Sequence, residues 1–210
     1  MINLTSTNEF DAFKSIFTQL LFSNQKPSDS ELIRESTLSC EIIKSITNER
    51  ILIDGDGTFS TSFNYSKYVQ DGDKFAQEEC IYWHKEFFES NKIPEIIEYL
   101  KENTYSKRAI SMIWQDKYMD LNGGASCISY AFFRIDNGKL NMNVHMRAND
   151  GYRCLLIDLD SLNALQKYVA DKLKLEVGTF THFVDSLHFY KLAENDIYEL
   201  LYKLKDLTSI

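Results

Sequence analysis

Apolar residues recur along the chain with two different periods, and these periods predict both helices and strands. Spacing of three and four residues predicts helices over residues 8–22, 73–90, 94–103, 160–173 and 195–207. Thr7 and Asp160 are the expected N-caps of the first and fourth of these helices, and Pro94 is expected to be the first residue of the third. Runs rich in Ile and Leu, or alternating apolar and polar residues, predict strands over residues 34–45, 50–53, 107–114 and 178–190.

The stretch from Cys127 to Asp158 predicts a β-hairpin. Two alternating runs flank the turn-forming triplet Asp136-Asn137-Gly138, and antiparallel pairing across this turn brings Cys127 close to Arg147. A thiolate beside a fixed cation suits a substrate that has an electrophilic carbon and an anionic group. A buried, inert cysteine beside a surface arginine is the alternative that these two residues leave open.

Composition limits the class of protein. A chain of 210 residues with 44% hydrophobic and 26% charged residues fits one soluble domain, residues 1–210. The net charge of −8 argues against nucleic acid as a partner. The N-terminus lacks a signal pattern, no apolar run approaches membrane-spanning length, and the four cysteines form no CxxC pair, so we expect a cytoplasmic protein without a membrane partner.

Metal binding is not expected. His84, His145 and His182 show no metal-ligand spacing with one another. The segment 54–57, DGDG, suggests a calcium loop, but Tyr65 stands at the twelfth position, where such loops have glutamate, so we interpret the segment as a turn.

Three segments resemble the thymidylate synthase family, and most closely its deoxycytidylate hydroxymethylase branch. They are SKRAISMIW (106–114), SCISYAFFRIDNGKLNMNVHMRAND (126–150) and SLHFY (186–190). The resemblance implies an α+β fold with a large, mostly antiparallel sheet that is covered by helices and buried on one face in a homodimer. It also implies a one-carbon transferase acting on a pyrimidine nucleoside monophosphate. Cys127 would add to ring carbon 6, and carbon 5 would then attack a one-carbon unit. This step needs a low thiol pKa, which we expect the adjacent arginines to supply.

Basic side chains from separate elements are candidates for binding the phosphate. If Arg34, Arg108 and Arg147 converge, their planar guanidinium groups match phosphate oxygens. The resemblance places Arg34 and Arg147 on phosphate-binding arginines, and it implies that Lys107 and Arg108 cross from the second subunit. Ala148 stands where the family usually has a phosphate-binding serine, which removes one hydroxyl contact.

The resemblance also assigns roles to polar residues around the base and the sugar. Glu79 is implied in proton transfer, with Glu78 as the alternative in the neighbouring register. Asp150 is implied in ordering the active-site network. His188 and Tyr190, two residues apart on one strand, correspond to the pair that hydrogen-bonds a sugar hydroxyl.

Asp158 is the candidate for reading the base. Counting from Arg147 without a gap, it falls where thymidylate synthases have asparagine and the cytidylate hydroxymethylases have aspartate. An ionised carboxylate only accepts hydrogen bonds, so it repels the carbonyl of uracil and accepts from the amino group of cytosine. The sequence therefore favours a cytidine nucleotide, with the end of a strand as the alternative reading of Asp158.

The half of the site that would bind folate departs from the family pattern. The segment 84–105 lacks the family's Tyr-Gly motif with tryptophans, and Arg153-Cys154 replaces a Leu-Gly pair. Methylenetetrahydrofolate is therefore an open question as cofactor. Two other functions stay open: folate-independent chemistry on a pyrimidine nucleotide, including cleavage of the base–sugar bond, and nucleotide binding without catalysis.

Overall fold

The computed structural model describes residues 1–24, 27–43, 92–114 and 126–206. These residues form six strands, four α-helices and one 3-10 helix. In chain order they are β1 (Ile2–Ser6), α1 (Glu9–Leu21), β2 (Leu32–Ile42), α5 (Lys92–Glu102), β3 (Ile110–Met112), β4 (Ile128–Asp136), β5 (Lys139–Asp150), α6 (Leu155–Leu173), β6 (Glu176–Tyr190), η3 (Lys191–Ala193) and α7 (Glu194–Asp206).

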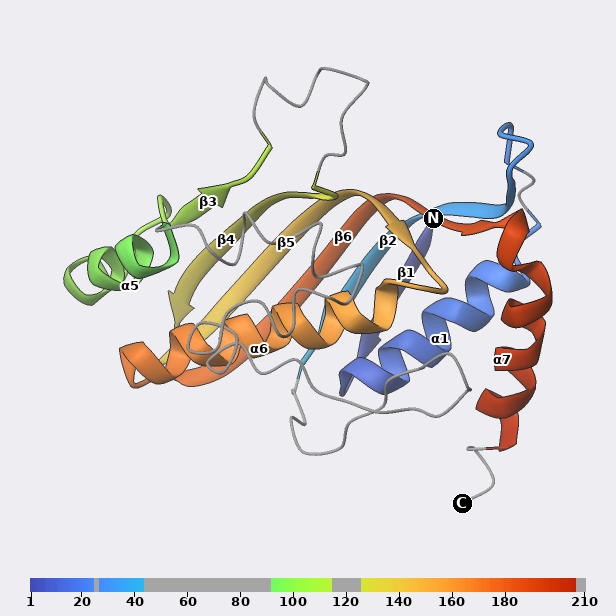
Figure 1. Cartoon of the computed structure of the whole chain (residues 1–210). Helices are drawn as coiled ribbons and strands as arrows, with labels where there is room; N and C mark the ends of the chain where they lie inside the picture. The colour runs from blue at the N-terminus through green and yellow to red at the C-terminus, as the bar shows by residue number, and fades with distance from the viewer. Residues whose placement is uncertain (25–26, 44–91, 115–125, 207–210) are drawn as a thin grey trace, which may run out of the picture.

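The strands form one sheet in the order β1-β2-β6-β5-β4-β3. The pairs β2–β6, β4–β5 and β3–β4 are antiparallel, whereas β1–β2 and β5–β6 are parallel. The parallel pair β5–β6 is joined through α6, because parallel neighbours need a long crossover. Helices α1 and α6 lie along the same face of the sheet (Figure 1). The predicted α+β fold, a mostly antiparallel sheet covered by helices, is confirmed.

The core lies between this face of the sheet and helices α1 and α6. Alternate residues of the central strands are buried there, as the two-residue period of a strand requires. The rings of Phe17 in α1 and Phe189 in β6 pack with centroids 4.9 Å apart, and both side chains are fully buried. Burial of one such ring stabilises the fold by about 1.5–3 kcal/mol.

The opposite face of the sheet carries a row of neighbours across four strands, which we call the second-face row: Met112, Tyr130, His145 and Phe183. The strand register pairs Met112 with Tyr130, Tyr130 with His145, and His145 with Phe183. The ring of His145 lies 5.4 Å from Tyr130 and 5.0 Å from Phe183, and its Nε2 lies 3.0 Å from Asp185 Oδ2. The side chain of Met112 is 58% exposed, so this face retains accessible apolar surface.

The central hairpin forms as the sequence predicts, but its second strand ends at Asp150 rather than continuing toward Asp158, and its turn is shorter than the predicted triplet. Asp136 pairs with Lys139, which leaves the two-residue loop Asn137-Gly138. Both residues have positive φ, 48° and 76°, as a type I′ turn requires, and Asn-Gly is the favoured sequence for that turn.

Helix α6 begins earlier than the sequence suggested, and the prediction that Asp160 caps it is wrong. The helix starts at Leu155 with Cys154 as its N-cap residue, and no side chain caps it. Instead, Asp150 Oδ1 accepts hydrogen bonds from the backbone N–H groups of Tyr152 (2.9 Å) and Arg153 (3.1 Å), which closes a tight turn before the helix. Asp158 consequently lies in the first turn of α6, and its alternative reading as the end of a strand is wrong.

Other sequence predictions differ in detail. Asn8, not Thr7, caps α1, because its Oδ1 accepts the N–H of Asp11 at 2.8 Å. Helix α5 begins at Lys92, so Pro94 is its third residue. The predicted strand 50–53, the turn 54–57 and the helix 73–90 lie outside the described residues, and strand β1 has no counterpart among the predictions.

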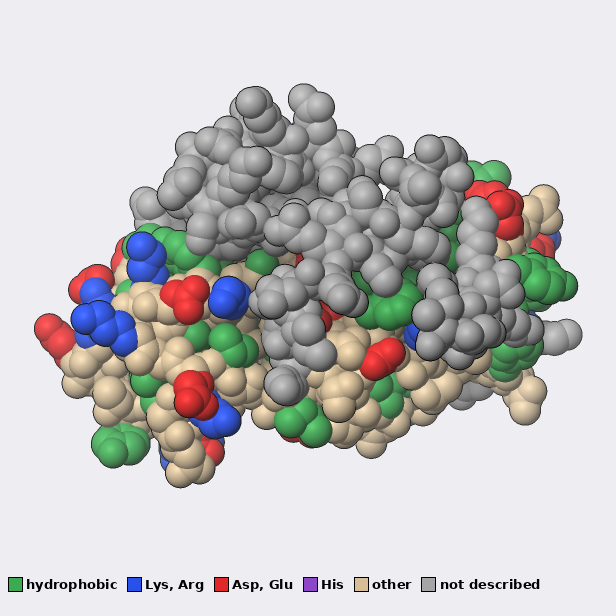
Figure 2. All heavy atoms as spheres, turned by 90° about the horizontal axis from the view of Figure 1, so that it is seen from below, with side chains coloured by type: hydrophobic (Ala, Val, Ile, Leu, Met, Phe, Trp, Pro, Cys, Tyr) green, Lys and Arg blue, Asp and Glu red, His purple; other side chains and the backbone are tan. Residues whose placement is uncertain are grey.

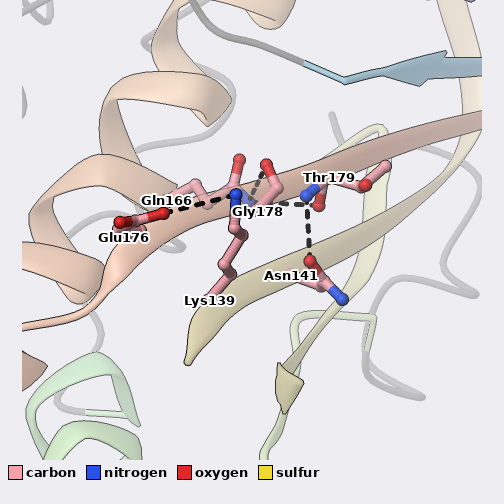
Figure 3. Close-up of polar contacts among 6 residues, drawn as sticks. All are labelled: Lys139, Asn141, Gln166, Glu176, Gly178 and Thr179. Atoms are coloured by element: carbon pink, nitrogen blue, oxygen red, sulfur yellow. Dashed lines mark hydrogen bonds and ion pairs between the residues drawn. The ribbon is translucent and has the colours of Figure 1, made fainter. Parts of the chain in front are cut away.

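Two side-chain amides, those of Asn141 and Gln166, join α6, β5 and β6 near the start of β5 and β6 (Figure 3). Asn141 Oδ1 accepts the N–H of Thr179 at 2.9 Å, where the register of β5 and β6 shifts. Gln166 Nε2 donates to the carbonyl oxygen of Thr179 at 3.1 Å. It also donates to the carbonyl oxygen of Leu140 at 2.8 Å, a contact that Figure 3 does not draw. These side chains satisfy backbone groups that the irregular pairing would otherwise leave without partners.

Charges on the described surface are mixed. On the face shown in Figure 2, acidic and basic side chains of the coloured part lie interspersed, and no broad basic patch is visible there. None of the described helices is long and apolar enough to cross a membrane.

Candidate active site

Four strands bring the candidate residues to one edge of the sheet. His188 of β6 pairs with Glu35 of β2 on one side and with Asp150 of β5 on the other. The next strand, β4, begins at the same edge, directly after Cys127. The candidate site is therefore the edge where β5 and β6 end and where β2 and β4 begin.

Backbone pairing holds Cys127 beside Arg147. The N–H of Arg147 donates to the carbonyl oxygen of Cys127 at 2.9 Å, so the hairpin places the two residues as the sequence predicts. The guanidinium Nε lies 3.4 Å from the carbonyl oxygen of Ser126, and the guanidinium carbon lies 5.7 Å from the ring centroid of Trp114. These contacts fix the cation next to a half-buried thiol.

The electrostatics of Cys127 differ from the expectation that neighbouring arginines lower its pKa. Burial is the largest cause and raises the pKa of the thiol above its ordinary value of 9.0. Arg147 lowers the pKa, but Asp158 and Asp150 raise it further. Burial and the two carboxylates thus outweigh Arg147 and raise the pKa of the thiol, so the expectation of a low pKa is wrong for the protein without a ligand.

Cys127 is distinguished from the other described cysteines. Cys40 is fully buried, and burial raises the pKa of its thiol to about 12. Cys154 is disulfide-bonded. Of the two free cysteines in the described part of the chain, Cys127 is thus the accessible one, and it lies at the sheet edge where charged groups gather.

Electrostatic coupling shows which candidates the fold brings together. Burial raises the pKa of Tyr190, as do Asp150 and Cys127, whereas Arg147 lowers it. Asp158, almost fully buried in the first turn of α6, acts on the same thiol. Cys127, Arg147, Asp150, Asp158 and Tyr190 therefore form one electrostatic group.

His188 joins this group through Tyr190. Their rings pack edge to face with centroids 4.7 Å apart. His188 Nδ1 lies 3.0 Å from the carbonyl oxygen of Ser186 and 3.3 Å from its hydroxyl, which in turn donates to Glu35 Oε1 at 2.6 Å. Glu35 and Ser186 were not among the predicted site residues, because only the pairing of β2 with β6 brings them together.

Other candidates are not joined to this group. Arg34 donates from Nε to the carbonyl oxygen of Leu21 (2.8 Å) and from Nη1 to that of Ile33 (2.6 Å), so these contacts are with the backbone. Lys107 and Arg108 are exposed between α5 and β3. Glu79 and its alternative Glu78 lie outside the described residues. Within the described ranges, no three His, Cys, Asp or Glu side chains are grouped to hold a metal ion.

Comparison with known sequences identifies the class to which this fold and this group of residues belong. The family model described as "Thymidylate synthase" matches residues 9–207. The chain belongs to the thymidylate synthase family.

Individual relatives agree with this assignment. A protein of Methanocaldococcus jannaschii named "Putative thymidylate synthase" is 34% identical over 105 residues, which are 48% of this chain and 47% of that protein. A protein of Methanosarcina barkeri with the same name is 25% identical over 174 residues, 83% of this chain and 73% of its own length. The thymidylate synthase of Mycoplasma genitalium is 27% identical over 114 residues, 54% of this chain and 39% of that enzyme. The match thus spans about half the length of the first relative.

Proposed function

We propose that the protein modifies carbon 5 of a pyrimidine nucleoside monophosphate through a covalent adduct of Cys127 at ring carbon 6. The observation that carries the proposal is the accessible free thiol of Cys127, held beside Arg147 and coupled to Asp150, Asp158 and Tyr190, in a chain of the thymidylate synthase family.

The reaction begins when Cys127 gives up its thiol proton to solvent and the resulting thiolate adds to carbon 6 of the pyrimidine. The electron pair of the 5,6 double bond moves to carbon 5, which then attacks a one-carbon electrophile. Loss of the carbon 5 proton and expulsion of the thiolate restore the double bond. Glu79 is the proposed proton carrier, and Asp150 orders the surrounding turn through its bonds to Tyr152 and Arg153.

Asp158 is proposed to select cytidine over uridine nucleotides. Its side chain is 1% exposed and close enough to Cys127 for its charge to raise the pKa of the thiol, so a base that reaches the thiol also comes near this carboxylate. A carboxylate accepts a hydrogen bond from the cytosine amino group and repels the uracil carbonyl. Hydroxymethylation of a cytidine monophosphate is therefore the preferred form of the reaction.

The phosphate and the sugar are assigned to the remaining candidates. Arg147 is proposed to bind the phosphate, because its cation is fixed beside the thiol. Arg34 would join it by turning its guanidinium from the backbone toward the ligand. His188 and Tyr190, packed ring to ring at the same sheet edge, are proposed to bind a sugar hydroxyl.

A homodimer is proposed to complete the site. The second-face row offers partly exposed aromatic and apolar side chains for a symmetric contact between two sheets. Lys107 and Arg108 are exposed between α5 and β3, and we propose that they reach the phosphate of the partner subunit.

The family normally uses methylenetetrahydrofolate, which supplies a one-carbon unit when bound. The residues expected to contact this cofactor do not fit it, because the segment 84–105 lacks the family's Tyr-Gly motif with tryptophans and Arg153-Cys154 replaces a Leu-Gly pair. We therefore derive no step through the folate, and the electrophile is specified only as a one-carbon unit.

Calorimetric titration with 2′-deoxycytidine and 2′-deoxyuridine 5′-monophosphate tests the proposed substrate class. Arg147→Ala should weaken both nucleotides alike, because phosphate contacts carry no base information. Arg134→Ala, a matched exposed arginine at the hairpin end of β4, should bind both nucleotides like the wild type. Absence of binding of either nucleotide to the wild-type protein would overturn the proposal.

A further inference from the structure

A chain of three polar side chains connects β2 to His188. The hydroxyl of Ser186 donates to Glu35 Oε1 at 2.6 Å. The oxygen of this hydroxyl lies 3.3 Å from His188 Nδ1. Ser186 lies at a bulge, since Val184 pairs with Leu38 and Leu187 with Ser36, so three steps along β6 face two steps along β2. His188 is 7% exposed, and Glu35 and Ser186 are both half-buried.

The chemistry of these groups fixes where the hydrogen of the imidazole lies. The carbonyl oxygen of Ser186, 3.0 Å from His188 Nδ1, can only accept a hydrogen bond, so this contact favours a hydrogen on Nδ1, whereas a hydroxyl hydrogen pointing at Nδ1 would oppose it. The Ser186 hydroxyl uses its own hydrogen on Glu35 and therefore also presents a lone pair to Nδ1. In the neutral ring, Nε2 is then an acceptor.

We propose that Glu35, acting through Ser186, is a positioning residue that holds His188 in the Nδ1–H tautomer, so that Nε2 accepts a hydrogen bond from a sugar hydroxyl of the nucleotide. The inference rests on the proposed function for the identity of the ligand, but the state of the imidazole is a property of the free protein.

Glu35 is needed because a hydroxyl group is ambivalent. Without the carboxylate, the Ser186 hydroxyl can rotate and donate to Nδ1, which favours the Nε2–H tautomer and turns Nε2 from acceptor into donor. Such a ring still donates to the sugar oxygen but no longer accepts the sugar hydrogen. The position of the hydroxyl hydrogen thus sets which hydrogen bond the ligand meets.

The first test is nitrogen NMR of the histidine ring in the protein without nucleotide, with His188→Gln used to assign the signals. At a pH at which the ring is neutral, the wild type should show His188 protonated at Nδ1 and unprotonated at Nε2. Glu35→Ala should increase the Nε2–H population, and Ser186→Thr, which keeps the hydroxyl, should restore the wild-type pattern relative to Ser186→Ala. An Nε2–H ring in the wild type, or an unchanged tautomer in Glu35→Ala, overturns the proposal.

The second test compares ligands that do and do not carry the hydroxyl. Binding of 2′-deoxycytidine and 2′-deoxyuridine 5′-monophosphate and of their 2′,3′-dideoxy counterparts is measured by calorimetry. Glu35→Ala should weaken the 2′-deoxynucleotides about three- to tenfold, the effect of one hydrogen bond, and leave the dideoxynucleotides unchanged. The control is Glu41→Ala, at an exposed glutamate on the same strand, which should change the affinity for neither type of ligand.

The two tests separate the failure of this inference from the failure of the proposed function. If Glu35→Ala weakens both ligand types equally, Glu35 acts on the fold and the inference is wrong. If the wild type binds no nucleotide, the proposed function fails, and the NMR experiment still decides whether Glu35 sets the tautomer.

Discussion

The backbone N–H of Arg147 donates a 2.9 Å hydrogen bond to the carbonyl oxygen of Cys127. Because this bond continues the β4–β5 pairing one residue beyond the start of β4, it holds the backbones of the two residues side by side. The same pairing leaves the thiol near two carboxylates, Asp150 and Asp158, which oppose its ionisation. The proposed nucleophile is therefore held beside a cation in surroundings that raise the pKa of its thiol.

The raised pKa of Cys127 predicts slow alkylation by iodoacetamide at neutral pH. The rate should rise with pH and reach half of its maximum above the ordinary value of 9.0, because burial, Asp158 and Asp150 disfavour the thiolate. Asp158→Asn removes a negative charge and should move the midpoint to lower pH, whereas Arg147→Ala should move it to higher pH. Cys127→Ser measures the background from the other cysteines, and a midpoint below 9.0 in the wild type would contradict this account.

The sequence could predict the hairpin because its determinants are local. Asn137 and Gly138 tolerate positive φ, and the alternating runs on either side fix the register that brings Cys127 to Arg147. The start of α6 could not be read in the same way, because a side chain upstream, Asp150, organises the turn in place of an ordinary N-cap. The position of Asp158 in a helix follows from that turn.

The direction of the pKa shift of Cys127 could not be predicted from the sequence either. Arg147 is close to Cys127 in the predicted hairpin, but Asp158 and the degree of burial depend on how α6 packs against the sheet. Glu35 likewise contacts Ser186 from a strand 151 positions away in sequence, through a pairing that contains a bulge. Such contacts have no signature in spacing or composition.

Gly178→Ala should destabilise the fold. A Cβ atom at this position would lie 2.0 Å from Asn141 Oδ1 and 3.0 Å from the carbonyl oxygen of Leu140. We expect a loss on the order of 1–3 kcal/mol in the free energy of unfolding, measured by urea denaturation, because the amide must leave its bond to Thr179. Asn141→Ala in the same background should recover only part of the loss, since the backbone carbonyl remains. If Gly178→Ala were as stable as the wild type, this result would contradict the described pairing of β5 with β6.

Charged substitution in the second-face row tests the proposed homodimer. Met112→Glu should convert the dimer to a monomer in light scattering at micromolar concentration, because the exposed apolar side chain would lie in the contact between subunits. Tyr105→Glu, an equally drastic change at a side chain that is 93% exposed, should leave the dimer intact. A stable wild-type monomer that still binds nucleotide would rule out the crossing of Lys107 and Arg108.

Asp158→Asn tests the reading of the base. The wild type should bind 2′-deoxycytidine 5′-monophosphate more tightly than the uridine equivalent by on the order of 1–3 kcal/mol, the cost of a buried polar group left unpaired. The amide restores a donor for the uracil carbonyl, so the substitution should shrink or reverse the preference. Calorimetric titration with both nucleotides measures the difference, and equal affinities in the wild type would remove Asp158 from base recognition.

Exchange of the hydrogen on carbon 5 tests the central claim most directly. A nucleotide labelled with tritium at carbon 5 is incubated with the protein, with and without methylenetetrahydrofolate, and the tritium released to water is counted. Attack by Cys127 on carbon 6 makes carbon 5 basic, so the wild type should release tritium in at least one of these conditions, while Cys127→Ser should bind the nucleotide and release none. Nucleotide binding without any tritium release by the wild type, or equal release by Cys127→Ser, would contradict the adduct mechanism.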